Sequence, residues 1–267
     1  MSVCRKELND PLTAVNGIQT NGDQTLSNVY LVRHGQAGTR DDYDSLSTLG
    51  RHQARLLGEY FVEQKIEFTA AYCGTMLRQQ QTASEVSTVF TEAGKAFPET
   101  VIDERWDEFD LARVYRELAP LLCETDAEFR RDLEAMLAEM KESAGAHDAL
   151  VHRRWRPSDT KMVETWVEGV LPYSGETWKQ FCSRVLSGGR SFENAPRHAN
   201  IIVFTSATPT AVLTSFALGI TEQRVRQLAG VLHNSSYTLL RQRDEQLRLF
   251  QFNAVPHLTT SELRTHR

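Results

Sequence analysis

The chain has 267 residues, of which 40% are hydrophobic, and a formal net charge of −5. This length suffices for one large α/β domain or two small ones, and the small negative charge gives no electrostatic basis for binding nucleic acid. No apolar run reaches the roughly 18 residues of a membrane span, and the first residues lack the apolar core of a secretory signal. Four scattered cysteines show neither zinc spacing nor a disulfide framework. We therefore expect a cytoplasmic protein with reduced thiols and neither nucleic acid nor membrane as partner.

The first strong signal follows a polar segment, residues 1–26, that we interpret as a flexible extension. The unbroken apolar run Val29–Val32 is typical of a strand buried on both faces, and it ends at Arg33 and His34. The carboxyl end of such a strand is where an open α/β sheet binds its ligand. A guanidinium can bind phosphate oxygens, and a neutral imidazole can attack phosphorus. The alternative is a strand that ends in two ordinary polar residues.

Two helices and a second strand follow. A helix is predicted from Ser47 or Thr48, either of which can serve as its N-cap. A short strand over residues 68–73 leads into a helix that ends near Phe90, and Arg78 lies near the first turn of that helix. A phosphate can contact a helix N-terminus and a guanidinium together. The alternative for Arg78 is a solvated helix arginine.

A third predicted strand, residues 99–103, precedes Glu108, which lies beside aromatic residues. This carboxyl group is a candidate general acid with a raised pKa, or else part of a solvated loop. Residues 110–170 show two amphipathic helical patterns without strand alternation, and we expect a helical insertion over the α/β core. The basic and aromatic run 152–157 is either a solvated loop or a lid that meets an anionic substrate.

The last third of the chain returns to α/β patterns. A helix from about residue 175 precedes the buried strand Ile201–Phe204, which ends in Ser206 and Ala207 before a helix over 209–218. The first amides of that helix are expected to face the same crevice as the first strand. Two further strands are predicted at 235–240 and 247–252, and residues after Val255 are expected to be frayed. The domain would thus span residues 27–255, followed by a tail, 256–267.

Together, residues 28–253 resemble the histidine phosphatase superfamily, also called the phosphoglycerate mutase-like fold. Arg33-His34-Gly35 matches the signature triplet of that family, and Arg78 resembles its second phosphate-binding arginine, in a similar Arg-x-x-Gln-Thr-Ala context. Glu108 falls where the family often has its proton-donating glutamate, and residues 175–177, Gly-Glu-Thr, resemble its Gly-Glu-Ser. The segment that includes residues 36–37 and 43–53 is similar to one bacterial branch.

The resemblance implies a three-layer αβα sandwich with a mostly parallel sheet and a helical lid. It also implies hydrolysis of phosphomonoesters through a phosphohistidine on His34, with Glu108 as proton donor and no metal or organic cofactor. The phosphate-binding residues would be Arg33, Arg78, Ser206 and Ala207. The partner would be a small phosphorylated substrate or inorganic phosphate, and the oligomeric state, with a homodimer as one option, stays open.

One position departs from the family pattern. Where the family has a second catalytic histidine after its last catalytic strand, this chain has Ser206. Loss of such a contact costs on the order of 10²–10³ in rate, judged from single oxyanion donors. Two hypotheses follow: an active phosphatase, in which nearby amides or His233 compensate, or a degenerate member that binds phosphate esters or a protein partner. For His233 the other interpretation is a structural role. Hydrolysis is favoured over mutase action, because nothing identifies a mutase substrate.

Overall fold

The computed structural model describes residues 27–38, 44–142, 157–193, 195–221, 224–243 and 246–266. The predicted extension over residues 1–26, and the basic run 152–157 except Pro157, lie outside these ranges. In the described part of the chain, no helix is both long and apolar enough to cross a membrane.

A six-stranded sheet in the order β3-β2-β4-β1-β5-β6 forms the centre of the fold. Its strands are β1 (Ser27–Arg33), β2 (Ala70–Cys73), β3 (Thr100–Ile102), β4 (Asn200–Thr205), β5 (Tyr237–Arg243) and β6 (Gln246–Ala254). The first four strands run parallel, whereas β5 pairs antiparallel with both β1 and β6. Because β1 and β4 have a paired neighbour on each side and helices on both faces, their sequences are continuously apolar.

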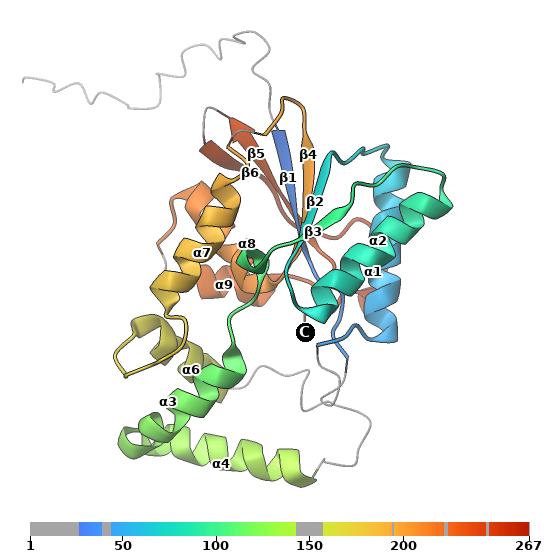
Figure 1. Ribbon diagram of the computed structural model, residues 1–267. Coiled ribbons are helices and arrows are strands. Elements are labelled where there is room, and N and C mark those ends of the chain that lie inside the picture. Colours follow the sequence, from blue (N-terminus) through green and yellow to red (C-terminus); the bar gives the residue numbers. More distant parts are fainter. Residues whose placement is uncertain are drawn as a thin grey trace, which may run out of the picture.

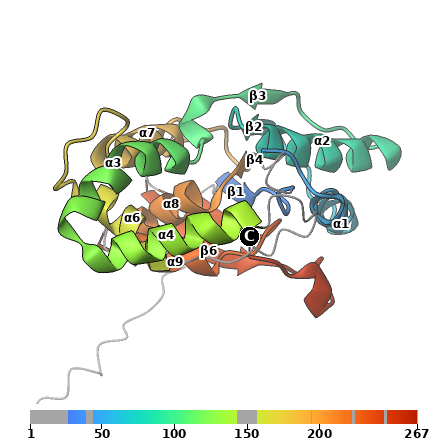
Figure 2. The same ribbon diagram turned by 90° about the horizontal axis from the view of Figure 1, so that it is seen from below.

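Helices cover both faces of this sheet, which makes the predicted three-layer αβα sandwich (Figures 1 and 2). One layer holds α1 (Thr48–Glu63) and α2 (Leu77–Glu92), and the other holds α7 (Trp178–Arg190), α8 (Ala207–Leu218) and α9 (Val225–Val231). Ser47 is the N-cap of α1, as one of the two sequence alternatives predicted, and accepts a hydrogen bond from the Gly50 amide. The short helix α9 was not predicted from the sequence.

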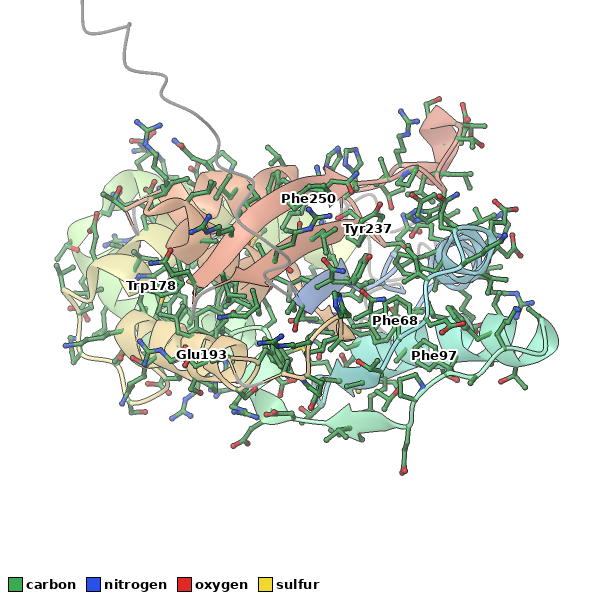
Figure 3. All side chains as sticks on the ribbon, turned by 90° about the horizontal axis from the view of Figure 1, so that it is seen from above. Phe68, Phe97, Trp178, Glu193, Tyr237 and Phe250 are labelled. Atoms are coloured by element: carbon green, nitrogen blue, oxygen red, sulfur yellow. The ribbon has the colours of Figure 1, made fainter. Side chains whose placement is uncertain are left out.

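Each face of the sheet has its own apolar core, since side chains alternate along β1. Tyr30 and Val32 point to the α1–α2 side, and Val29 and Leu31 to the other. Figure 3 shows Phe68 and Phe97 on the side of α1 and α2, where their rings lie 5.9 Å apart, and Trp178 on the α7 side. The two cores fix the sheet between the helical layers and so hold the carboxyl ends of the parallel strands in place.

The insertion is helical over its described residues, as the sequence predicts. It comprises α3 (Leu111–Thr125), α4 (Ala127–Glu142) and α6 (Pro157–Glu168), and a 3-10 turn, η2 (Glu104–Trp106), connects β3 to it. In Figure 1 these helices lie below the sheet, at the end where β1 and β4 finish. The insertion therefore stands over the carboxyl edge of the sheet.

The expectation of a frayed end after Val255 is wrong for residues 256–266. Leu258 is fully buried, and a second 3-10 turn, η4, spans Ser261–Leu263. Gln53 Nε2 donates to the Leu263 carbonyl at 2.7 Å, and the Asn234 amide donates to the Thr265 carbonyl at 2.7 Å. These long-range hydrogen bonds order the segment. Its own polar sequence does not predict them, because their partners lie far away along the chain.

Candidate active site

Backbone contacts at the end of β1 place His34 at the carboxyl edge of the sheet. The His34 amide donates to the Thr205 carbonyl at 2.9 Å, which joins the ends of β1 and β4. The next residue, Gly35, passes so close to α1 that a Cβ there would lie 2.3 Å from the Gly50 carbonyl oxygen. Only glycine allows this approach, so the turn after His34 depends on the residue type at position 35.

The hydrogen bonds of the His34 ring define its tautomer. Its Nδ1 lies 2.7 Å from the Gly35 carbonyl oxygen, and because a carbonyl can only accept, Nδ1 carries the proton. The Arg78 Nε group donates to Nε2 at 3.2 Å, which requires a lone pair on Nε2. Burial, followed by repulsion from Arg78 and Arg33, lowers the pKa of His34 well below 6.5. The ring is therefore neutral, with Nε2 as its nucleophilic atom.

Two buried arginines flank this ring. Arg33, at the end of β1, donates from Nη1 to the Leu232 carbonyl, and Arg78, in the first turn of α2, pairs through Nη1 with Asp44 Oδ1 at 2.7 Å. Thr82 Oγ1 donates to the Arg78 carbonyl at 2.7 Å and accepts from the Gly35 amide at 3.1 Å. Thr82 thus ties the start of α2 to the His34 turn. The arrangement concentrates positive charge around a neutral imidazole, which suits a dianionic ligand.

Glu108 bridges the loop after η2 and the start of α8. Its Oε2 accepts from the Thr208 amide at 3.1 Å, and its Oε1 accepts from the Phe109 amide at 3.2 Å. Burial raises the pKa of Glu108, whereas the hydrogen bonds from Thr208 and Phe109 and the charge of Arg78 oppose that rise. A carboxyl group with a raised pKa near a phosphate site can serve as a proton donor.

Ser206 is the N-cap residue of α8 and is only 1% exposed. Its Oγ accepts a hydrogen bond from Gln79 Nε2 at 2.9 Å, and the same amide donates to the Trp106 carbonyl at 3.1 Å. Gln79 itself is fully buried. Ala207, the other predicted phosphate-binding position at this end, is the first residue of α8.

The structure thus brings the sequence-predicted residues to one edge of the sheet: Arg33, His34, Arg78, Glu108, Ser206 and Ala207. Gln79, Thr82 and Asp44 also contact the site and were not predicted from the sequence. Gln79 is one of three consecutive glutamines, and no sequence signal separates the buried one from its neighbours. His233 lies close to His266, with ring centroids 4.1 Å apart, and its amide donates to Asn253 Oδ1 at 2.8 Å.

A cleft of about 340 Å³ opens beside Glu108. We call it the acidic cleft, and it is lined by Glu104, Asp107, Glu108, Asp110, Arg113, Tyr173, Glu176 and Arg184. Among the described residues, no cluster of three or more histidine, cysteine or acidic side chains is arranged to hold a metal ion.

Comparison with known proteins gives relatives with the same fold. The structure resembles Bacillus stearothermophilus YhfR, with a TM-score of 0.58 and 19% identity over 86% of this chain and 98% of that one. It also resembles phosphoglycerate mutase from Bacillus anthracis, with a TM-score of 0.55 and 14% identity over 88% and 96% of the two chains. A third similar structure is mycobacterial glucosyl-3-phosphoglycerate phosphatase Rv2419c, with a TM-score of 0.53 and 19% identity over 86% and 99%.

Sequence comparison adds a curated relative and a family. The serine/threonine-protein phosphatase Pgam5, mitochondrial, of Caenorhabditis elegans is 32% identical over 94 residues, 31% of this chain. This match spans about a third of the length of that relative (33%). The model of the histidine phosphatase superfamily (branch 1) matches residues 29–157 and 110–255, which together cover most of the chain. The chain therefore belongs to the histidine phosphatase superfamily, branch 1.

Proposed function

We propose that this protein hydrolyses phosphomonoesters through a phosphohistidine formed on Nε2 of His34. The observation that carries the proposal is the geometry of that ring: Nδ1 donates to the Gly35 carbonyl, and Nε2 keeps its lone pair beside Arg78. A nitrogen that stays neutral in a cationic pocket is a competent nucleophile for a dianionic ester. Family membership supports phosphatase-type chemistry, and similar proteins include both phosphatases and a mutase.

The first half-reaction transfers the phosphoryl group to the enzyme. Nε2 of His34 attacks phosphorus, the N–P bond forms, and the ester P–O bond breaks. Arg33 and Arg78 stabilise the negative charge on the phosphoryl oxygens. Glu108, whose pKa burial raises, gives a proton to the departing alkoxide. Asp44 is 56% exposed and holds Arg78 only until an ester binds, when the phosphoryl group takes its place on the guanidinium.

The second half-reaction is hydrolysis. A water molecule attacks the phosphohistidine, the Glu108 carboxylate accepts its proton, and the N–P bond breaks to release inorganic phosphate. The two arginines supply the positive charge in both steps, so the proposed chemistry needs no metal or organic cofactor.

Ser206 contributes a hydroxyl hydrogen to the phosphate-binding site. Because its Oγ accepts from Gln79 Nε2, the lone pair that faces Gln79 is occupied and the O–H is directed elsewhere. We propose that this O–H donates to a phosphoryl oxygen and that Gln79 positions it. The Ala207 amide, in the first turn of α8, is the second hydrogen-bond donor at this end of the phosphate-binding site.

The test is the turnover of p-nitrophenyl phosphate by the wild type, His34→Ala and His52→Ala. His52 is an exposed histidine on α1 and serves as the matched control. We expect His34→Ala to abolish turnover and His52→Ala to retain it. We also expect mass spectrometry of the wild-type enzyme, quenched during turnover without acid, to show a phosphoryl group on His34. Turnover that survives in His34→Ala would refute the mechanism.

The absence of the second histidine favours one alternative, a degenerate member that binds phosphate esters or a protein partner. In that case the wild type shows no turnover above His34→Ala yet still binds vanadate, with affinity lost in Arg78→Ala. The sequence-based prediction of a cytoplasmic protein stays a prediction, and the curated Pgam5 relative is named as mitochondrial.

A further inference from the structure

Residues 256–266, which we call the C-terminal segment, contact the active site through Gln53, a fully buried residue of α1. Gln53 Nε2 donates to the Leu263 carbonyl at 2.7 Å and to Thr265 Oγ1 at 3.0 Å, so the segment supplies two acceptors for this one group. On its other side, Gln53 Oε1 accepts from the backbone amide of Gln36 at 2.8 Å. Because a carbonyl only accepts and a backbone amide only donates, these partners fix the orientation of the Gln53 side-chain amide.

The Gln36 amide belongs to the peptide group that orients the His34 ring. The carbonyl of that same peptide group is the one of Gly35, whose oxygen lies 2.7 Å from His34 Nδ1. Since a peptide group is planar, the partner of its N–H also sets the direction in which its C=O points. Gln53 therefore holds in place the acceptor that keeps the proton on Nδ1 and leaves the lone pair of Nε2 free to attack phosphorus.

This peptide group depends on an external partner because a glycine precedes it. Gly35 has no Cβ, so rotation about its backbone bonds meets less steric resistance than at any other residue type. The local chain thus leaves the direction of the Gly35 carbonyl weakly determined. The hydrogen bond from the Gln36 amide to Gln53 supplies the missing constraint.

Thr265 also connects the C-terminal segment to the preceding peptide group of the same turn. Its Oγ1 donates to Asn234 Oδ1 at 3.0 Å, and its carbonyl accepts from the Asn234 amide at 2.7 Å. Asn234 is fully buried and donates from Nδ2 to the His34 carbonyl at 3.4 Å. The Thr265 hydroxyl therefore accepts from Gln53 and donates to Asn234, and these two partners contact the peptide groups on either side of Gly35.

We propose that Gln53 and Thr265 are positioning residues for phosphoryl transfer, which hold the turn after His34 so that its ring keeps the proton on Nδ1. The inference rests on the proposed function, because it takes Nε2 of His34 as the nucleophile. When the Gly35 carbonyl turns away, Nδ1 loses its acceptor, and part of the molecules carry the proton on Nε2, where it blocks the attack. Phosphate binding by the arginines is unaffected, so the step that loses rate is the attack itself.

The test compares Thr265→Val, which removes only the hydroxyl, with Thr265→Ser, which retains it, and with Gln53→Met, under conditions in which urea unfolding shows each variant to be folded. The kinetic readout is kcat/KM for p-nitrophenyl phosphate, which reports the first half-reaction. We expect it to fall about tenfold in Thr265→Val and about 10²-fold in Gln53→Met, on the order of the losses seen when partners that orient metal-bound histidines are removed. Thr265→Ser should restore the wild-type value, and the inhibition constant of inorganic phosphate should stay unchanged in all variants.

The structural readout is the protonation of the two His34 ring nitrogens, measured by NMR of ¹⁵N-histidine-labelled protein, with His34→Ala to assign the signals. The wild type should show a proton on Nδ1 and none on Nε2, whereas Gln53→Met and Thr265→Val should show a mixture of tautomers. Ser261→Ala is the control, because Ser261 lies on the same 3-10 turn but donates to Glu262 and not to Gln53. It should match the wild type in both readouts.

A variant that is less stable but keeps the wild-type rate and tautomer would overturn the inference, and so would a lower rate with an unchanged tautomer. The hydrolase proposal fails separately. If the wild type does not hydrolyse p-nitrophenyl phosphate, that proposal is overturned, and the spectra alone decide the inference: a changed His34 tautomer in Gln53→Met and Thr265→Val supports it, and an unchanged one overturns it.

Discussion

Replacement of Ser206 by histidine tests how the site accommodates a serine at the end of β4. The Gln79 amide lies 2.9 Å from Ser206 Oγ, and the two residues are 0% and 1% exposed. An imidazole at position 206 extends past the position of Oγ and therefore collides with that amide. Because neither side chain can move into solvent, Ser206→His should overpack the site.

The size of the effect follows from the contacts. Overpacking of a well-packed core costs about 1–3 kcal/mol of unfolding free energy, and we expect Ser206→His to lose about 2 kcal/mol. Gln79→Ala loses the hydrogen bonds to Ser206 Oγ and the Trp106 carbonyl, at about 1 kcal/mol each. The double variant is nearly volume-conserving, since Ser206→His adds as many heavy atoms as Gln79→Ala removes. The double variant should therefore lose less unfolding free energy than the two single variants lose together. The difference should be at least about 1 kcal/mol, on the order of measured coupling energies between contacting residues.

The assay combines urea unfolding with p-nitrophenyl phosphate kinetics in a double-mutant cycle. We expect Gln79→Ala/Ser206→His to exceed the wild type in kcat by about tenfold or more, since it gains a stronger phosphoryl-binding donor. The control cycle pairs Ser206→His with Gln80→Ala, because Gln80 bonds to the Thr75 carbonyl instead. Additive stability changes at positions 79 and 206, or equal coupling in the control cycle, would refute the packing argument.

Three further predictions concern the acid, the tight turn and pH. Glu108→Gln should lower kcat/KM for an alkyl phosphate by about 10²–10³, and for p-nitrophenyl phosphate by less than tenfold, because nitrophenolate leaves without protonation. Equal losses would remove Glu108 from its role as acid. Gly35→Ala should lower the free energy of unfolding by about 3 kcal/mol, as measured in urea, because the added Cβ meets the Gly50 carbonyl. In the control Gly230→Ala, the added Cβ meets nothing within 4 Å, so this variant should be neutral or slightly stabilising. Burial lowers the pKa of His257 to about 4, so its neutral form stabilises the fold fully above pH 6.5, and that contribution is lost progressively as the pH falls from 6.5 to about 4. Between pH 7.5 and 4.5, the wild type should therefore lose about 2–3 kcal/mol more than His257→Leu in urea unfolding.

The sequence by itself determined the α/β class and the position of the site. The apolar runs in β1 and β4 are long enough to indicate strands buried on both faces, and each is followed by polar residues. Because parallel strands end at a common edge, Arg33, His34 and Ser206 had to lie near one another once those two strands were paired. Arg78 and Glu108 were predicted by the same logic, since each follows a shorter strand.

Only the tertiary structure decided which polar groups contact those residues. Gln79 is buried against Ser206 while Gln80 bonds to Thr75, and nothing in a run of three glutamines separates them. The order of residues 256–266 depends on Gln53 and Asn234, which lie far away in the sequence. Local sequence encodes strand and helix through periodicity, whereas pairing of polar side chains depends on distances between elements. Those distances are set by packing of the whole core, which is why the charge of the acidic cleft became visible only in the folded chain.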